Sequence, residues 1–338
     1  MARIDVEAFE DEWEDDHAFV EPRRKTDALS QAAKDRLAEH EVARVVAVDR
    51  GRITVVFEDE LLPARFAGGM RGTKISVGDR VRVVPPRHEN DTARITELLE
   101  RASWLIRTGD DAQDDERVVV ANADQIVIVL TADHLEGGVR FADRVLVAAS
   151  VGRLDPVLCL NKFDLVVGTD GEGMVRDVAA RYEAIGVPVR VTSAETGEGV
   201  DELRELLAGT WTAFTGHSGV GKSSLFNLLV PDVDQAVADI GRFGGRHTTV
   251  AALAVPVPGL DAWLVDTPGV RSFGLGTLDA DHLADHFPEL ARLDCELDDC
   301  LHDGEPGCVL PAAAAGEVHP ARLETYRRLL AALRDANA

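Results

Sequence analysis

Eight consecutive residues have the composition of a phosphate-binding loop. They read GHSGVGKS and are Gly216, His217, Ser218, Gly219, Val220, Gly221, Lys222 and Ser223, with Ser224 directly after them. The apolar segment 211–214 is expected to lead into the loop as a strand, and 224–229 to lead out as a helix. Glycines let backbone N–H groups close around an anion, Lys222 neutralises the β- and γ-phosphates, and the Ser223 hydroxyl ligates Mg²⁺. The motif predicts a nucleotide site.

A second motif supplies further groups on the phosphate side. The residues Asp266, Thr267, Pro268 and Gly269 follow a short apolar segment at 263–265 that we expect to be a strand. We expect Asp266 to hold Mg²⁺ through a water molecule, and the Gly269 N–H to sense the γ-phosphate. The glycine-rich polar segment 241–250 is typical of a first switch, in which Thr249, or alternatively Thr248, supplies a hydroxyl to Mg²⁺.

Two further motifs have the chemistry of guanine recognition. Asn161, Lys162, Phe163 and Asp164 (NKFD) follow an expected strand at 156–160, and the triplet at 192–194, which contains Ser193 and Ala194, follows another at 187–191. The Asp164 carboxylate accepts from both N1–H and the N2 amino group of guanine, which adenine does not offer. The Lys162 stem lies on the base plane, and the Ala194 N–H meets O6. Asn161 either contacts the O6/N7 edge or ties loops together.

Three of the four cysteines lie close together near the end of the chain. Cys295, Cys300, His302 and Cys308 offer three thiolates and an imidazole, a set that predicts one structural Zn²⁺ per chain; free cysteines in a loop are the alternative. Zinc would contribute ~10 to 16 kcal/mol of folding free energy to a segment with few apolar residues. Cys159 stands alone in an apolar strand and is expected in the core.

Length and charge limit the classes of protein. The 338 residues predict two or three domains, and the net charge of -24 argues against a protein that coats nucleic acid generally. Residues 41–107 differ, because they hold twelve Arg or Lys and ten Asp or Glu. No apolar stretch approaches the ~18 residues of a membrane span, and the acidic start does not resemble a signal peptide. We therefore expect a cytoplasmic protein without a membrane partner.

The chain divides into four expected parts. Residues 1–38 are an acidic tail, expected to be disordered; 28–41 could form a short helix, and a solvated linker is the alternative. Residues 39–107 alternate in polarity between closely spaced turns and predict an OB-fold-like β-barrel. Residues 108–280 carry the nucleotide motifs, and 281–338 form a mostly helical zinc module. Its last helix begins at Pro320 and places Leu323, Tyr326, Leu330 and Leu333 on one face.

The outer face of the expected barrel is rich in arginine. Its members are Arg44, Arg52, Arg65, Arg71, Arg80, Arg82 and Arg87. Guanidinium groups suit RNA phosphates, and an ordinary solvated barrel face is the alternative.

The order of the motifs indicates a circular permutation, because the base-recognition motifs precede the phosphate loop, the first switch and DTPG. With the barrel before and the cysteines after, residues 40–335 resemble the ribosome small-subunit-dependent GTPase A family (RsgA, also called YjeQ). The resemblance rests on GHSGVGKSSLFN, NKFD, GRHTT, DTPGVRSFG and the cysteine cluster. It implies a circularly permuted Ras-like α/β GTPase that acts in late maturation of the small (30S) ribosomal subunit, is stimulated by it and binds its rRNA. The acidic tail and the insert at 110–116 fall outside the family pattern. We expect a monomer.

Val270 occupies the position at which Ras-type GTPases place a glutamine that orients water. The resemblance points instead to His247 in the first switch as the catalytic group; a histidine that only steadies the switch is the alternative.

Two other functions compete with that of a ribosome-assembly GTPase. One is a nucleotide-gated switch that grips another RNA or a protein through the barrel and zinc module, and the other is an ATP-dependent enzyme, which NKFD disfavours.

Overall fold

The computed structural model describes residues 41–49, 51–70, 72–86, 88, 91–107, 117–233, 252–267, 273–275, 278–297, 300–310 and 318–336. The predictions for the tail at 1–38, the insert at 110–116, the first switch at 241–250, Gly269, and the barrel arginines Arg71 and Arg87 lie outside these residues.

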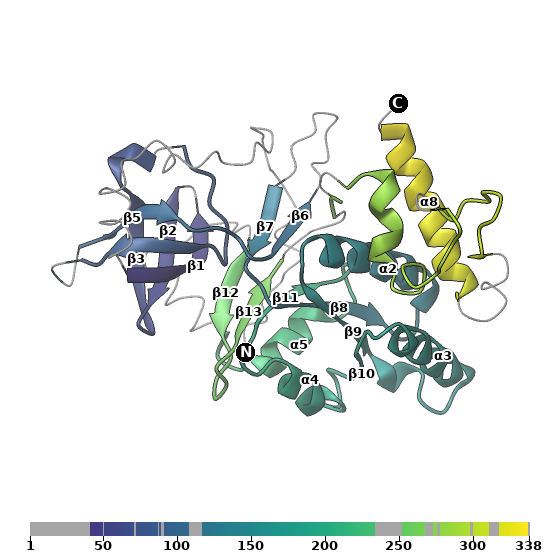
Figure 1. The fold of residues 1–338 in the computed structure, drawn as a ribbon. Coiled ribbons are helices and arrows are strands. Elements are labelled where there is room, and N and C mark those ends of the chain that lie inside the picture. The colour runs from purple at the N-terminus through teal and green to yellow at the C-terminus, as the bar shows by residue number, and fades with distance from the viewer. Residues whose placement is uncertain are drawn as a thin grey trace.

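The described chain begins with strands and then alternates strands with helices (Figure 1). The strands are β1 (Glu41–Asp49), β2 (Arg52–Phe57), β3 (Glu60–Phe66), β4 (Arg80–Val84), β5 (Ala93–Leu98), β6 (Trp104–Arg107), β7 (Arg117–Ala121), β8 (Gln125–Thr131), β9 (Asp155–Asn161), β10 (Val189–Val191), β11 (Trp211–Thr215), β12 (Leu253–Pro256) and β13 (Trp263–Asp266). The helices are α2 (Leu135–Val151), α3 (Asp170–Ala184), α4 (Val200–Leu206), α5 (Lys222–Leu229) and α8 (Pro320–Ala336), with short 3-10 turns η3 (Gly68–Met70), η4 (Phe163–Leu165) and η5 (Ala280–His286).

The first five strands form the predicted barrel. β1 pairs with β2 on one side and with β4 on the other, and the ladder continues through β3 and β5, so the sheet closes on itself. Alternate residues point inward and form a core of their own, in which Val45, Val55, Val81 and Ile95 are fully buried. The period-2 pattern of the sequence therefore marked the inward positions correctly.

The second half of the sheet is the nucleotide-binding domain. Its strand order is β10-β9-β8-β11-β13-β12, with parallel pairing from β10 to β13 and an antiparallel β12 at the edge. Helices α2 and α3 lie on one face and α4 and α5 on the other (Figure 1), which explains why β8 is apolar at nearly every position. The strand that carries the phosphate loop, β11, is central in space but late in the chain, as the predicted circular permutation requires.

The barrel is joined directly to the nucleotide-binding domain. The Cα atoms of Ala47 in β1 and Leu253 in β12 are paired, so one eleven-stranded sheet runs through both parts. The short strand β12 was not predicted from the sequence. A second contact is made by the loop before β4, where the Ala121 N–H donates to the Val77 carbonyl at 2.8 Å.

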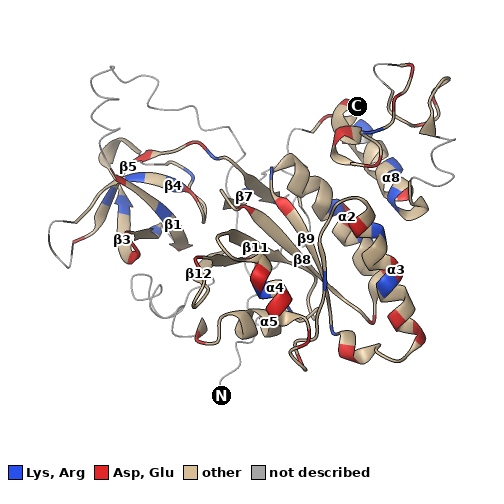
Figure 2. Ribbon diagram, turned by 60° about the horizontal axis from the view of Figure 1, so that its bottom comes forward, with Lys and Arg blue, Asp and Glu red and all other residues tan. Residues whose placement is uncertain are grey.

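The expectation that Arg44 faces solvent to bind RNA is wrong. Its guanidinium carbon lies 3.5 Å from the centroid of the Trp211 ring, and its N–H groups donate to the carbonyls of Gly78 and Asn122. Burial, opposed by Asp124, lowers the pKa of Arg44 to about 10. Arg44 points outward from the barrel but into the junction with the next domain. Other basic residues lie on the barrel strands (Figure 2). Among them, Arg52 of β2, Arg65 of β3 and Arg80 of β4 are exposed.

The C-terminal helix α8 shares the core of the nucleotide-binding domain. It packs against α2 and η5, and Tyr326 and Leu330 are buried in the same apolar cluster as β8. Leu323 and Leu333 are partly buried against that cluster, which confirms the predicted apolar face. α2 begins at Leu135. In the parts of the chain that the structure describes, no helix combines the length and the apolar character needed to cross a membrane.

Candidate nucleotide site and metal centre

The phosphate loop joins β11 to α5, the strand-loop-helix context that its sequence predicted. Gly221 has a φ of +94°, and a Cβ there would lie 2.3 Å from Asn161 Nδ2. Only glycine fits this close approach between the phosphate loop and the NKFD segment. The absence of a side chain at Gly221 therefore lets the phosphate loop contact the NKFD segment.

Lys222 points back over its own loop. Its Nζ donates to the carbonyls of Gly216 at 2.6 Å and His217 at 3.2 Å. Burial lowers the pKa of Lys222, and the Asp266 carboxylate opposes that effect. The ammonium group therefore stands in a desolvated position, where a phosphate would gain most from its charge.

Asp266 ends β13 beside the strand that carries the phosphate loop. Its Cα is paired with that of Phe214 in β11, and the neighbouring Thr267 hydroxyl donates to the Phe214 carbonyl at 2.6 Å. Burial raises the pKa of Asp266, and Lys222 opposes the rise. A desolvated carboxylate of this kind is stabilised by a cation, so the residues present fit a magnesium ion. Ser223 lies in the first turn of α5, which follows β11. Because β11 and β13 are parallel, Ser223 and Asp266 lie at the same edge of the sheet.

Asn161 connects the two sides of the site. It is fully buried at the end of β9, and its Nδ2 donates to the Val220 carbonyl of the phosphate loop at 2.9 Å. Its Oδ1 accepts from the Ala194 N–H at 3.1 Å and from the Thr192 hydroxyl at 3.2 Å. Of the two roles left open for this side chain, the contacts match the one that ties loops together.

Asp164 is oriented by the next loop along the sheet. The Ser193 hydroxyl donates to Asp164 Oδ1, and the Ser193 oxygen in turn accepts from the Thr196 N–H at 3.1 Å. Lys162 adopts a left-handed backbone conformation, with a φ of +64°, immediately before the turn that contains Asp164. The structure therefore brings together the residues predicted for the base, at the carboxyl ends of β9 and β10, and the described residues predicted for the phosphates, at the carboxyl ends of β11 and β13. His247, Thr249 and Gly269 lie outside the described residues.

Cys295, Cys300, His302 and Cys308 converge on one point. Their ligand atoms all lie within 4.8 Å of one another, and the His302 Nδ1 is 3.5, 3.6 and 3.5 Å from the three Sγ atoms. With zinc bonds of about 2.3 Å to sulfur and about 2.0 Å to nitrogen, the sulfur–nitrogen edges of a tetrahedron are about 3.5 Å long. These separations fit the edges of a metal tetrahedron, so the cluster could hold a metal ion.

The protonation of the thiols would depend on whether a metal ion is bound. Burial and the neighbouring thiols raise the pKa of Cys300 to about 12, so the thiolate form is disfavoured without a metal. Glu305 supports the loop from outside the ligand set, because its carboxylate accepts from the Leu301 N–H at 3.1 Å and the Asp303 N–H at 2.8 Å. The Val309 N–H lies 3.5 Å from the Cys295 sulfur.

Sequence reasoning missed three residues that shape the sites. Thr192 anchors Asn161, and its place at the end of a strand before Ser193 was a usable signal. Glu305 lies between two ligands in the sequence, which is also a signal. Phe141 of α2 packs on the His217 ring, with centroids 4.3 Å apart, and nothing in the sequence indicates that contact.

Comparisons with known proteins agree with this geometry. Residues 98–276 match the RsgA GTPase family. The chain is 38% identical over 299 residues to the "Small ribosomal subunit biogenesis GTPase RsgA" of Gemmatimonas aurantiaca, an alignment that spans 84% of this chain and 95% of the relative. The relative of the same name from Chlorobaculum tepidum is 38% identical over 270 residues, spanning 77% and 85%.

Solved structures show the same architecture. The crystal structure of YjeQ from Thermotoga maritima aligns with a TM-score of 0.71 at 30% identity, and covers 87% of this chain and 98% of that one. YloQ, described as a circularly permuted GTPase, aligns with a TM-score of 0.69 at 25% identity, and covers 88% and 96%. On the strength of the motifs, the permuted sheet and these matches, the chain belongs to the RsgA GTPase family and is a GTP hydrolase.

Proposed function

We propose that this chain hydrolyses GTP in the late biogenesis of the small ribosomal subunit, to which it binds. The relatives that span most of the chain carry that role in their names. The GTP-binding part of the proposal is best supported by the contacts of Asn161. Its side chain joins the guanine-side loops to the phosphate loop in one site.

Guanine is selected by the Asp164 carboxylate, which Ser193 holds in place, with the Lys162 stem against the base. The Ala194 N–H donates to Asn161 Oδ1 at 3.1 Å, and it would donate to O6 when guanine binds. The phosphates are held by the backbone of 216–224 and by Lys222, and the Gly269 N–H senses the γ-phosphate.

Mg²⁺ bound with GTP would be held by Ser223, Thr249 and Asp266, and would neutralise charge on the phosphates. The cysteine cluster holds one Zn²⁺ per chain in a structural role, because four protein ligands leave no open position for substrate.

His247 orients the attacking water and accepts its proton, because Val270 has no polar group to do so. The water oxygen bonds to the γ-phosphorus as the bond to the bridging oxygen breaks, which gives GDP and phosphate. Docking on the subunit accelerates this step, a kind of effect that reaches about 10³- to 10⁵-fold in other GTPases when a partner completes the site.

Ribosomal RNA is contacted by the outer face of the barrel, where Arg52, Arg65 and Arg80 are exposed. We also propose that the chain works as a monomer in the cytoplasm, where it would meet a ribosomal subunit.

The test is single-turnover GTP hydrolysis with and without purified small subunits, with large subunits as the control. We expect stimulation by small subunits alone, and we expect His247→Ala to keep GTP and subunit binding but to lose most of the stimulated rate. Equal stimulation by large subunits, or no stimulation by small subunits, would contradict the proposed role at the small subunit. Full stimulation of His247→Ala would assign the catalytic group to another residue.

A further inference from the structure

One turn of α2 lies between the phosphate loop and the C-terminal helix. Phe141 and Asp143 are two positions apart, so their side chains leave the helix roughly 200° from each other. Phe141 faces the His217 ring at 4.3 Å, and Asp143 faces α8. Arg144 lies on the Phe141 side and donates from Nε and Nη2 to the Phe273 carbonyl at 3.2 Å each.

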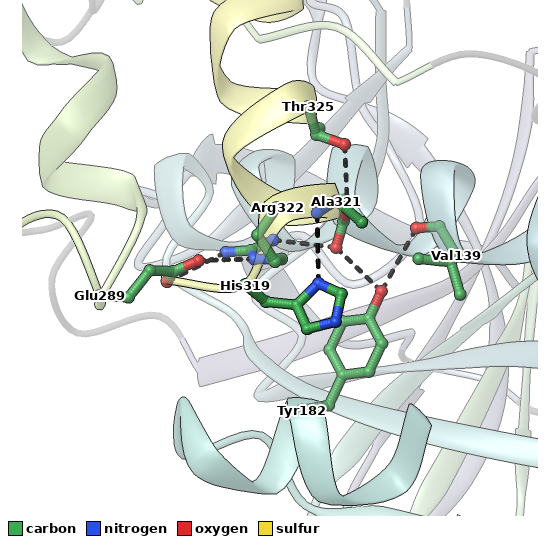
Figure 3. Close-up of polar contacts among 8 residues, drawn as sticks. Val139, Tyr182, Glu289, His319, Ala321, Arg322 and Thr325 are labelled. Atoms are coloured by element: carbon green, nitrogen blue, oxygen red, sulfur yellow. Dashed lines mark hydrogen bonds and ion pairs between the residues drawn. The ribbon is translucent and has the colours of Figure 1, made fainter. Parts of the chain in front are cut away.

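Asp143 is held by donors from two helices. Its Oδ1 accepts from the Tyr182 hydroxyl of α3 at 2.8 Å and from Arg322 Nη1 of α8 at 3.0 Å, and its Oδ2 accepts from the Thr325 hydroxyl at 3.1 Å. Figure 3 shows Arg322 and Thr325 of α8 on one side of this cluster and Tyr182 of α3 on the other. These contacts use both oxygens of the carboxylate and fix its direction.

Arg322 is shared with a second carboxylate. Its Nε and Nη2 donate to Glu289 at 2.7 and 3.3 Å, and its guanidinium lies 4.6 Å from the centroid of the Phe287 ring. The side chains of Asp143 and Arg322 are 0% and 1% exposed. Buried ion pairs of this kind are often no more stable than apolar residues of the same size, but they restrict two elements to one relative orientation. Here the restricted pair is α2 and α8.

The other side of the turn reaches the nucleotide site. The His217 carbonyl accepts from Lys222 Nζ, so the residue whose ring packs on Phe141 also contacts the phosphate-binding ammonium. Phe141 is 8% exposed, and its ring also lies 6.1 Å from that of Phe273. A shift of α2 would therefore move the support of the phosphate loop.

We propose that α8 positions the phosphate loop: Arg322 and Thr325 fix α2 through Asp143, and Phe141 on the same turn holds the His217 ring. Phe141 is a positioning residue, and occupancy of the GTP site becomes coupled to the docking of the C-terminal helix. The inference rests on the proposed nucleotide site and assigns it a means of regulation.

The test uses the full-length, zinc-loaded chain and a fluorescent GDP analogue. Thr325→Val removes one donor to Asp143 without changing side-chain shape, and Phe141→Leu removes the ring at the other end. Each variant should weaken GDP binding by about 2- to 30-fold, the range seen for mutations along coupled networks, and the double variant should lose less than the product of the two. Arg140→Met is the matched control on α2, because its pair with Glu324 is exposed, and it should bind GDP as the parent does.

A second readout reports position without nucleotide. The nuclear magnetic resonance signal of the His217 ring is shifted by the nearby Phe141 ring, so Thr325→Val should move it while Arg140→Met leaves it in place. Parent affinity and an unmoved His217 signal in Thr325→Val would overturn the proposal, as would parent affinity in Phe141→Leu. A parent chain that fails to bind GDP would instead refute the proposed nucleotide site.

Discussion

The side chain of Asn161 uses its hydrogen bonds on protein groups and not on a base. It joins the carbonyl of Val220 to the N–H of Ala194 from a fully buried position. Asp164, three residues later, is partly exposed and is held by Ser193. The contacts of Asn161 are therefore structural, whereas Asp164 keeps the recognition role that we propose for it.

Asn161→Ala should lower both stability and nucleotide affinity. The substitution leaves the Val220 carbonyl and the Ala194 N–H without their partner, at a cost of about 1 to 3 kcal/mol for a buried group. Urea unfolding and titration with a fluorescent GDP analogue measure the two effects. Unfolding at the parent midpoint, together with parent affinity, would contradict the role of Asn161 as a tie between loops.

Asp164→Asn should change the preferred base and leave stability near that of the parent. The amide keeps one acceptor for N1–H but replaces the acceptor facing the N2 amino group of guanine with a donor, which suits the O2 carbonyl of xanthine. Competition between GDP and xanthosine diphosphate measures the preference. Unchanged GDP affinity would remove Asp164 from the base site.

At the scale of elements, the cysteine loop and α8 are held by different forces. The loop has its four candidate metal ligands and few apolar residues, whereas α8 has Tyr326 and Leu330 in the core and Arg322 in the ion network. The Tyr326 hydroxyl donates to the Leu301 carbonyl and connects them.

Cys300→Ser should therefore lower the zinc content and expose the loop before it releases the helix. We expect faster amide hydrogen exchange over 300–310, with α8 still protected by packing on α2. Atomic absorption and exchange measured by mass spectrometry are the assays. Stoichiometric zinc in the variant would contradict the ligand assignment, and equally fast exchange over α8 would make the metal its main support.

The sequence predicted the elements that carry motifs, because strand, loop and helix alternate there with strong apolar periodicity. It did not predict the burial of Asp143 and Arg322, since an amphipathic pattern assigns charged residues to the solvated face of a helix. The prediction that Arg44 faces solvent was wrong for a related reason. Alternation of polar and apolar residues identifies the outer face of a barrel, but it does not show which part of that face another domain covers. β12 is only four residues long and depends on partners distant in the sequence.

At the scale of the molecule, the barrel is built onto the edge of the nucleotide-binding sheet. β1 pairs with β12, which leads through β13 to Asp266, and Arg44 stacks on Trp211 at the start of the strand that carries the phosphate loop. The loop before β4 fits so closely that a Cβ on Gly78 would lie 1.8 Å from the Ala121 carbonyl oxygen. The barrel has a separate core, so this junction can be weakened without unfolding it.

Gly78→Ala tests whether a fixed barrel is needed for stimulation by the small subunit. Gly78 and Gly72 have φ angles of +89° and +84°, so alanine strains the backbone at both, but the space around Gly72 is open within 4 Å. Gly72→Ala therefore controls for strain alone, about 1 kcal/mol, and should retain most of the stimulation. Gly78→Ala adds the clash with Ala121, which should tilt or release the barrel and change the small-angle X-ray scattering profile.

Hydrolysis by Gly78→Ala without subunits should stay within about twofold of the parent, because the phosphate and base contacts are untouched. Its stimulated hydrolysis should fall by about tenfold or more, equivalent to about 1.4 kcal/mol in the barrier. If Gly78→Ala changes the scattering profile and is still stimulated like Gly72→Ala, the barrel serves only as a tether, and its orientation carries no signal to the GTP site.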